Sequence, residues 1–527
     1  MATTAAPPVE EPARLQAEAP AGSYPLLTGT SFTAIGAVMA WFAVQLAQFV
    51  GEAPDFDAMI SLRESIVFHR DGLKGLIADR VGTGVHPPLM DTLTSISFAL
   101  FGEDPRSQQL IGVLLFAVLA VAVERLLAPY LSATYRVLAA LAVAMTPSLA
   151  LVLFTVSREG LVLVLVTVSL AYTLAPVELT RRRLVILSAI LALFPLTKDA
   201  CLVLVGPFAL YAFFVGAKSV SDRIQRALIV VSLPLAMSIV WRIVLKASGG
   251  DAWHTWITSQ RADEGPFVVA VRAMFGMERS LNLRQNLANA LIVNWLWVPA
   301  LLAIVTVVFV WRRGTPAIRR SVGLIGGLAA MFTWTTLTFP TFSVPRYATP
   351  LTLLVLLIIL IGLPLWPRRG RAWVLAALIV TAALGAWSPT DPVSRSLWHT
   401  MTLGGERFYD TPWEARGPDR NVYNLALLRA SERMNARLRR VFATNVDVVT
   451  GDCDSMKFGE KLFSVGFTPS VYDRGIPGAR PLECIHLDQL PPNAANGPQK
   501  IGLVRTVEED TQKQPPALTG KSVVIIH

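Results

Sequence analysis

The chain has 527 residues, of which 53% are hydrophobic and only 16% charged, and its mean hydropathy is +0.50. This balance excludes a single soluble globular core and indicates a polytopic membrane protein. The net charge of +10 does not indicate nucleic-acid binding, because Lys and Arg lie mostly in short loops between apolar runs.

Three parts are predicted along the chain. Residues 1–31 are rich in Ala, Pro and Glu and lack the basic start of a secretory signal, which predicts a disordered cytoplasmic tail. Residues 32–388 form the predicted transmembrane domain, and residues 389–527 follow it. Apolar runs of about 17–25 residues predict eleven transmembrane helices, which are 32–50, 107–128, 136–156, 159–176, 184–197, 200–216, 225–246, 290–311, 321–340, 347–366 and 372–388.

The division at Thr197-Lys198-Asp199 decides the topology, because one long helix over 184–216 would reverse every later span. Loop charges favour the division: with the N-terminus in the cytoplasm, the inner loops hold most of the cations, as the positive-inside rule requires. These are Arg125, Arg136, Arg181, Arg182, Arg183, Lys218, Arg223, Arg226, Arg312, Arg313, Arg319, Arg320, Arg368, Arg369 and Arg371, whereas the short outer loops hold Arg158, Lys198 and Arg346.

This topology places residues 51–106, 247–289 and everything after 389 outside. Charged groups at membrane depth cost at least a few kcal/mol each, so those at the outer ends of spans are candidates for one outward-facing site. The alternative is that each is an interfacial charge solvated by water and headgroups.

The first outer loop is predicted to contain two juxtamembrane helices. The stretch PDFDAMISLRESIVFHRDG (54–72) has its apolar residues near one helical face, as in a helix that lies along the membrane surface. HPPLMDTLTSISFALFG (86–102) opens with two prolines, which start a helix but do not sit inside one. It is too short to be an ordinary span.

The C-terminal part, 389–527, has a different composition. It contains an amphipathic helical pattern at 423–440, a strand-like NVDVVTG (445–451) and a terminal KSVVIIH (521–527). This alternation predicts a small extracytoplasmic α/β domain.

The order of these elements resembles the GT-C superfamily of glycosyltransferases, in the branch of the protein O-mannosyltransferases and the lipid A aminoarabinose transferase. The resemblance covers roughly residues 32–366. Its motifs are the acidic stretch after the first span, HPPL, SREGLVLVLVTVSLAYTL (157–174), LALFPLTKDACLVLVGPFALYAFF (191–214) and PRYATPLTLLVLLIIL (345–360).

The resemblance implies an enzyme that transfers a sugar, with inversion, from a polyprenyl-phosphate donor to an extracytoplasmic glycan, lipid or protein. Such an enzyme sits in the lipid bilayer, and the expected location is the bacterial inner (cell) membrane. The alternative from another class is a polytopic transporter or lipid flippase. Transporters place polar and helix-breaking residues near mid-membrane and show internal repeats, whereas the polar groups here favour the outer ends.

The reaction needs a general base for the acceptor hydroxyl. The family motif reads Asp-Glu-Ala, whereas this chain has Asp55-Phe56-Asp57-Ala58, which leaves open which carboxylate is the base. We favour Asp57, because a helix N-terminus keeps a carboxylate ionised, with Asp55 next. Either residue is alternatively an N-cap of the surface helix.

The departing carrier phosphate needs cationic hydrogen-bond donors. Lys198, Arg346 and Arg158 are the candidates, and Arg63 is a further one. His86 stands where relatives often keep His or a basic residue that meets the phosphate or a metal; alternatively, it is a helix cap before Pro87.

Glu159 matches a family acid that orients donor or acceptor, and the alternative is that it only pairs with Arg158. No His/Cys spacing of a structural zinc site occurs in the sequence. No cofactor is assigned, and a divalent cation held by carboxylates stays open.

Overall fold

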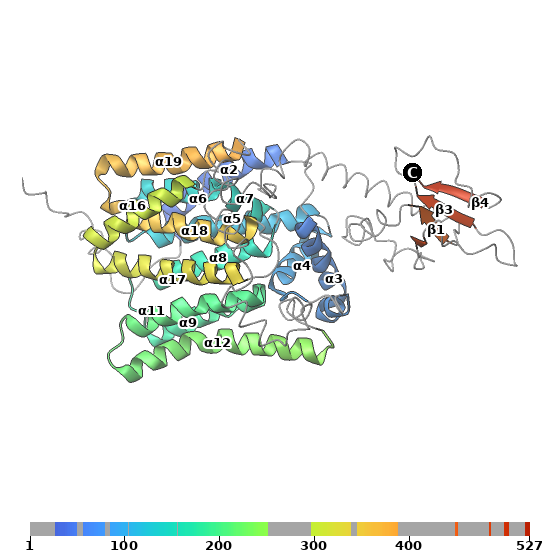
Figure 1. The fold of residues 1–527 in the computed structure, drawn as a ribbon, viewed down its shortest axis with the longest axis horizontal. Coiled ribbons are helices and arrows are strands. Elements are labelled where there is room, and N and C mark those ends of the chain that lie inside the picture. The colour runs from blue at the N-terminus through green and yellow to red at the C-terminus, as the bar shows by residue number, and fades with distance from the viewer. Residues whose placement is uncertain are drawn as a thin grey trace, which may run out of the picture.

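The computed structural model of the protein describes residues 27–49, 56–79, 85–103, 105–154, 156–250, 297–338, 345–387, 448–451, 484–485, 500–504 and 522–526. Up to residue 387 the described chain is helical, and the described strands all follow residue 447 (Figure 1).

Each of the eleven predicted spans contains a described helix or a pair of short helices. The helices are α2 (Gly29–Phe49), α3 (Phe56–Asp79), α4 (Leu89–Phe101), α5 (Pro105–Leu127), α6 (Ala133–Met145), α7 (Pro147–Phe154), α8 (Arg158–Thr173), α9 (Arg181–Leu191), α10 (Leu193–Thr197), η1 (Asp199–Leu204), α11 (Val205–Phe214), α12 (Val220–Ala247), α16 (Trp297–Arg313), α17 (Pro316–Thr338), α18 (Pro345–Gly362), η3 (Leu363–Leu365) and α19 (Arg368–Trp387). In the described part, Ser107–Leu127 and Val220–Ala247 are long and apolar enough to cross a membrane. The count of eleven crossings therefore stays a prediction.

The span predicted over 136–156 is divided into α6 and α7. Thr146 is extended (φ −61°, ψ 120°) and ends α6, and α7 begins at the next residue, Pro147. Proline disfavours a helical conformation in the residue before it and has no N–H to continue the hydrogen-bond ladder. The break is thus a local consequence of the sequence.

The chain reverses direction between α9 and α11. At one end of α12, Arg181 of α9 donates to Gln225 (2.8 Å), and Arg226 donates to the carbonyl of Ala212 near the end of α11 (3.1 Å). The first residue of α9 and the last turn of α11 therefore contact the same part of α12. One continuous helix over 184–216 could not do this, so the predicted division at Lys198 is confirmed.

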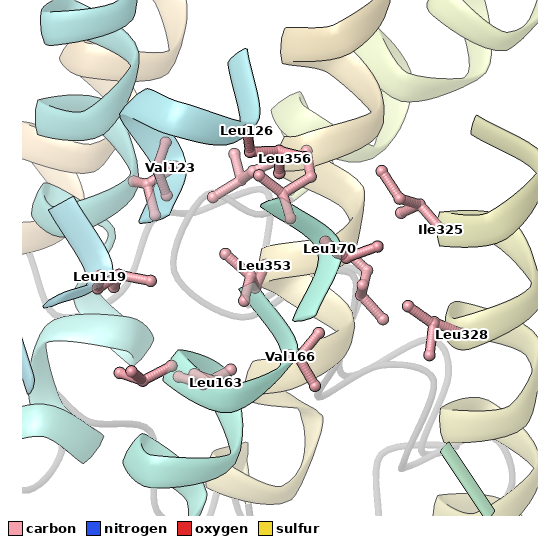
Figure 2. Close-up of a cluster of buried hydrophobic side chains, with 14 of the residues drawn as sticks. Leu119, Val123, Leu126, Leu163, Val166, Leu170, Ile325, Leu328, Leu353 and Leu356 are labelled. Carbon is pink, nitrogen blue, oxygen red and sulfur yellow. The ribbon is translucent and has the colours of Figure 1, made fainter. Parts of the chain in front are cut away.

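The largest described apolar core extends across many of the helices, and α5, α8, α17 and α18 contribute a large part of it. Figure 2 shows Leu353 and Leu356 from α18 in the middle of the cluster, with residues of α5 and α8 around them and Ile325 and Leu328 from α17 at the right. The four helices come from separate parts of the sequence, and this shared core fixes the frame on which the polar end groups are held.

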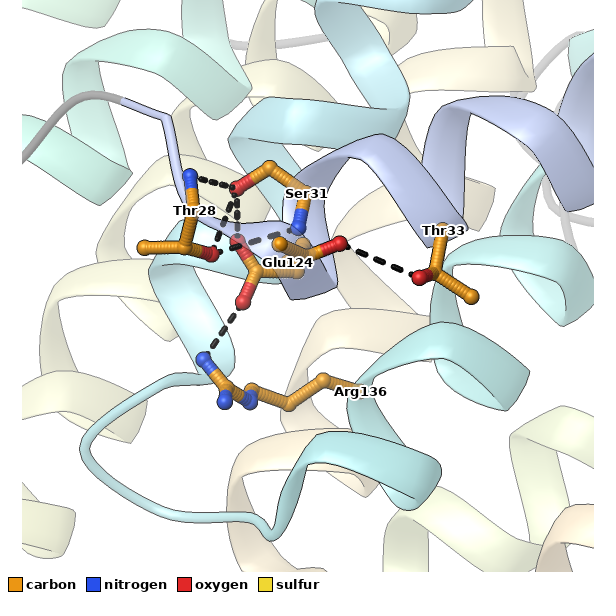
Figure 3. Close-up of polar contacts among 6 residues, drawn as sticks. Thr28, Ser31, Thr33, Glu124 and Arg136 are labelled. Atoms are coloured by element: carbon orange, nitrogen blue, oxygen red, sulfur yellow. Dashed lines mark hydrogen bonds and ion pairs between the residues drawn. The ribbon is translucent and has the colours of Figure 1, made fainter.

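A buried polar cluster joins three helix ends on the predicted cytoplasmic side (Figure 3). Glu124 near the end of α5 is fully buried and accepts hydrogen bonds from Ser31 of α2 (2.8 Å) and from Arg136 of α6. Ser31 is itself buried in α2, which begins at Gly29, within the last residues of the segment 1–31 that is predicted as a tail. Residues 1–26 lie outside the described part.

The C-terminal strands form one parallel sheet in the order β2-β1-β3-β4. They are β1 (Val448–Gly451), β2 (Cys484–Ile485), β3 (Lys500–Val504) and β4 (Ser522–Ile526). β1 and β4 fall in the two segments predicted as strands. Parallel neighbours need crossover connections, usually helices; the connecting residues and the helix predicted at 423–440 lie outside the described part. The α/β domain therefore stays a prediction.

We predict that Glu124→Gln destabilises the protein by about 3–5 kcal/mol, as breaking a buried ion pair does, because Arg136 loses its carboxylate partner. SDS-induced unfolding of the purified protein measures the change. Glu178→Gln is the matched control, since Glu178 is exposed. Equal stability of the two variants would show that the cluster does not hold these helix ends together.

Candidate active site

The start of α8 is fixed by local structure. Ser157 caps the helix by accepting a hydrogen bond from the N–H of Gly160 (3.4 Å). A Cβ atom on Gly160 would lie 2.7 Å from the carbonyl oxygen of Val152 in α7, so only glycine allows this close approach. Together, the cap and the contact set the position of Arg158, the first residue of α8.

Arg158 is buried between two carboxylates from the segment between α2 and α5, the predicted first outer loop. Its Nη2 atom donates to Glu64 of α3 (2.5 Å) and to Oδ2 of Asp91 in α4 (3.2 Å). Ser65 of α3 donates to the other Asp91 oxygen (2.9 Å). Glu64, Ser65 and Asp91 are fully buried. These bonds join α3, α4 and α8 at a single point.

Two acids share one cation in this cluster. Burial raises the pKa of Asp91 to about 6; the Arg158 guanidinium opposes the shift, and the charge of Glu64 adds to it. The shift remains upward because one guanidinium cannot fully compensate two buried carboxylates. The positive charge of Arg158 is thus matched within the cluster.

A second ion pair lies beside the first. The chain between α10 and η1 is extended at Lys198 (φ −157°, ψ 123°), and the Lys198 ammonium donates to Glu159 of α8 (2.8 Å). Consecutive residues of a helix do not face each other. Glu159 therefore pairs with Lys198 while its neighbour Arg158 pairs with Glu64, so the alternative of an Arg158–Glu159 pair is not what the structure has.

The two juxtamembrane helices are also bonded to each other. His69 of α3 lies 2.9 Å from the Ser95 hydroxyl of α4, and Arg70 pairs with Glu103 just beyond α4 (2.6 Å). The surface helix predicted over 54–72 corresponds to the first part of α3, which kinks at Gly72 (φ 65°), a conformation that favours glycine.

The second part of α3 packs against α12. Leu76 and Ile77 form a small buried apolar cluster with Val85 before α4 and with Trp241 and Leu245 of α12. The segment that contains α3 and α4 is therefore held at two places, by ion pairs to α8 and by apolar contacts to α12 (Figure 1).

The other predicted site residues are less fully described. Asp57 is the second residue of α3 and Arg346 the second residue of α18. Arg63 is also in α3, and the side chains of these three residues lie outside the described part, as does all of Asp55. His86 is half-buried in the segment that enters α4.

Sequence reasoning did not identify Asp91, Ser65 or Glu64 as site residues. The available signal was the composition of α4, where Asp91 is the one acid in LMDTLTSISFALF. A carboxylate in so apolar a helix needs a buried partner or a ligand.

Residues 85–241 match the family model of the dolichyl-phosphate-mannose-protein mannosyltransferases. The matched segment contains Asp91, Arg158, Glu159 and Lys198, whereas Asp57 precedes it. A search among curated proteins gave no match. The family match confirms the resemblance to the GT-C superfamily and supports a membrane glycosyltransferase of that kind.

We predict that Arg158→Gln lowers the free energy of unfolding by about 3–5 kcal/mol, because Glu64 and Asp91 remain buried without their cation. Combining it with Glu64→Gln and Asp91→Asn removes all three charges and should recover most of the loss. SDS-induced unfolding compares the variants, with exposed Arg182→Gln as control. A triple variant as unstable as Arg158→Gln would refute the charge explanation.

Proposed function

We propose that this GT-C-type membrane glycosyltransferase moves a sugar from a polyprenyl-phosphate donor to an acceptor hydroxyl outside the cytoplasm. The observation that carries the proposal is that two ion pairs, Arg158–Glu64 and Lys198–Glu159, join the first outer loop, α8 and the break after α10 at one end of the helices. The sequence-based topology makes this the outer end.

The base in this proposal is Asp57, with Asp55 as the alternative. Asp57 is in the first turn of α3, where the helix N-terminus favours the ionised carboxylate. It precedes Glu64, which ties the same helix to Arg158. Docking of α3 would then set the position of the base relative to α8.

We assign the donor phosphate to Lys198 and Arg346, with Arg63 and His86 as further donors. The Lys198 side chain is 24% exposed while its ammonium donates to Glu159. For Arg158 we now favour a positioning role over direct phosphate binding, because its guanidinium is buried and bonded to two carboxylates. Glu159 would in turn orient the Lys198 ammonium.

The direct test uses purified protein in liposomes with radiolabelled polyprenyl-phosphate sugars. We expect the label to leave the lipid carrier and to join an acceptor. Label that crosses the bilayer still attached to its carrier would instead identify a flippase, and no change in either respect would overturn the proposal.

We predict that Asp57→Asn lowers the transfer rate about 100- to 10,000-fold, the usual effect of removing a positioned general base, while donor affinity changes little. Asn caps a helix nearly as well as Asp, so a residue that serves only as a cap would leave transfer almost normal. Asp55→Asn is the matched variant. Loss in Asp55→Asn alone would move the base to that residue, and normal rates in both would remove the proposed base.

A separate prediction concerns Lys198. Lys198→Met should weaken donor binding, but it also leaves Glu159 without its cation. The double variant Lys198→Met with Glu159→Gln removes both charges, so it should recover stability without recovering donor affinity. Binding of polyprenyl phosphate to protein in nanodiscs distinguishes the two effects: donor affinity restored in the double variant would contradict phosphate binding by Lys198.

A further inference from the structure

Arginines gather at one end of α16, α17 and α19, in a segment that has no acidic residues. They are Arg312, Arg313, Arg319, Arg320, Arg368, Arg369 and Arg371. The sequence from residue 297 to residue 387 contains no Asp or Glu. The segment therefore supplies no carboxylate to neutralise these charges.

This end of the helices is opposite the candidate site. The Tyr130 hydroxyl, between α5 and α6, is hydrogen-bonded to Ser321 of α17 (2.7 Å). The start of α17 therefore lies beside the end of α5, where Glu124 is buried. In Figure 1 the turn from α16 to α17 lies at the left, whereas α3 and α4 lie at the right. The sequence-based topology makes the arginine-rich end the cytoplasmic one.

An aromatic contact holds the last turn of α16 against the start of α19. The rings of Phe309 in α16 and Trp366, which precedes α19, meet edge to face with their centroids 5.0 Å apart. The indole N–H of Trp366 donates to the hydroxyl of Thr306 in α16 (3.1 Å). The Arg313 guanidinium lies over the Phe309 ring, 5.4 Å from its centroid. The arginines of the two helix ends are thus brought together at one place.

The seven arginines divide into two groups. Arg319 and Arg371 donate to backbone carbonyls at the ends of α16 and η3 (2.8 Å and 2.7 Å), groups that helix ends otherwise leave without partners. Arg320 donates to a carbonyl of its own helix (3.2 Å). The other four are exposed and make up what we call the basic surface, namely Arg312, Arg313, Arg368 and Arg369.

Membrane topology alone does not account for the composition of this segment. The positive-inside rule depends on Lys and Arg, and acids contribute little to it. Other predicted inner loops do contain acids at or near their ends: Glu124 pairs with Arg136, Glu178 precedes α9 and Asp222 is in the first turn of α12. A basic surface without acids is instead suited to a negatively charged partner.

Two exposed tryptophans favour a lipid as that partner. The side chains of Trp311 and Trp373 are 68% and 75% exposed. Trp311 directly precedes Arg312, and Trp373 is four residues after Arg369. Indole rings favour the boundary between lipid headgroups and acyl chains. The basic surface therefore lies level with the headgroup phosphates, where a lipid can contact both the arginines and the indole rings.

We propose that the basic surface binds an acidic phospholipid of the cytoplasmic leaflet. The guanidinium groups of α16 and α19 donate to its phosphate oxygens, an arrangement in which arginine forms two parallel hydrogen bonds. Trp311 and Trp373 lie beside its acyl chains. Because arginines come from two helices, a lipid with two phosphates, such as cardiolipin, engages both helix ends and should bind more tightly than phosphatidylglycerol, which has one.

The test measures lipid binding to the full-length protein in neutral detergent by native mass spectrometry, with cardiolipin, phosphatidylglycerol and phosphatidylcholine as probes. The wild type should bind them in that order of decreasing affinity. The double variant Arg368→Gln with Arg369→Gln should bind cardiolipin roughly 10- to 100-fold more weakly, as expected for two cations near a membrane surface. Its binding of phosphatidylcholine should not change.

The matched control is Arg182→Gln with Lys218→Gln, which removes the same charge from two exposed positions of other predicted inner loops and should keep wild-type affinity. Arg368→Lys with Arg369→Lys keeps the charges that set topology, and it should still bind cardiolipin less tightly than the wild type, because an ammonium lacks the planar fork of a guanidinium.

Three results would overturn the inference. The first is wild-type affinity for cardiolipin in both the Gln and the Lys variants. The second is an equal loss in the Arg182→Gln, Lys218→Gln control, which would reduce the effect to net charge. The third is equal affinity of the wild type for phosphatidylglycerol and for soluble glycerol phosphate, which would indicate a site for free anions and not for a lipid.

Discussion

The arrangement of α3, α4 and the start of α8 depends on the burial of one guanidinium between two carboxylates. α3 and α4 belong to a loop, and Arg158 bonds both of them to the head of a core helix through Glu64 and Asp91. Buried ion clusters of this kind add little net stability, and apolar residues of similar volume can often replace them. They require one geometry, however, because any other docking leaves a charge unpaired. We infer that this cluster sets the orientation of the loop, while Leu76 and Ile77 supply apolar packing against α12.

The polar contacts also show which helix ends lie together at each end of the molecule. Glu124 joins the start of α2 to the end of α5 and the start of α6, whereas Arg158 joins the heads of α4 and α8 at the opposite ends of the neighbouring helices. This alternation agrees with the positions of the basic loops in the sequence. One end therefore holds a paired acid that joins helix ends, and the other holds the two ion pairs around which the candidate site is built.

Much of this fold could be predicted from the sequence, because membrane thickness and the distribution of Lys and Arg constrain helices locally. The reversal at Lys198 and the first part of α3, up to the kink at Gly72, both follow from short segments. The pairing of Arg158 could not be predicted in this way: its partners are 94 and 67 positions away, and Glu159 next to it is a plausible partner that helix geometry excludes. Lys198 and Glu159 could be identified as polar residues at the outer end, but only the packing of α8 against α10 makes them a pair.

The same docking bears on which acid is the base. An α-helix turns by about 100° per residue, so helix positions seven residues apart, such as 57 and 64, share a face, whereas residue 55 precedes the helix, which begins at Phe56. Glu64 is bonded to Arg158. Because position 57 lies on the same face of the same helix, this bond restrains position 57 more directly than position 55. The family motif has its second acid at the place of Asp57, and the first acid is replaced here by Phe56. A loop held by Glu64 and Asp91 can tolerate that replacement, because the contacts that orient α3 lie in the following turns and not in the acidic motif itself.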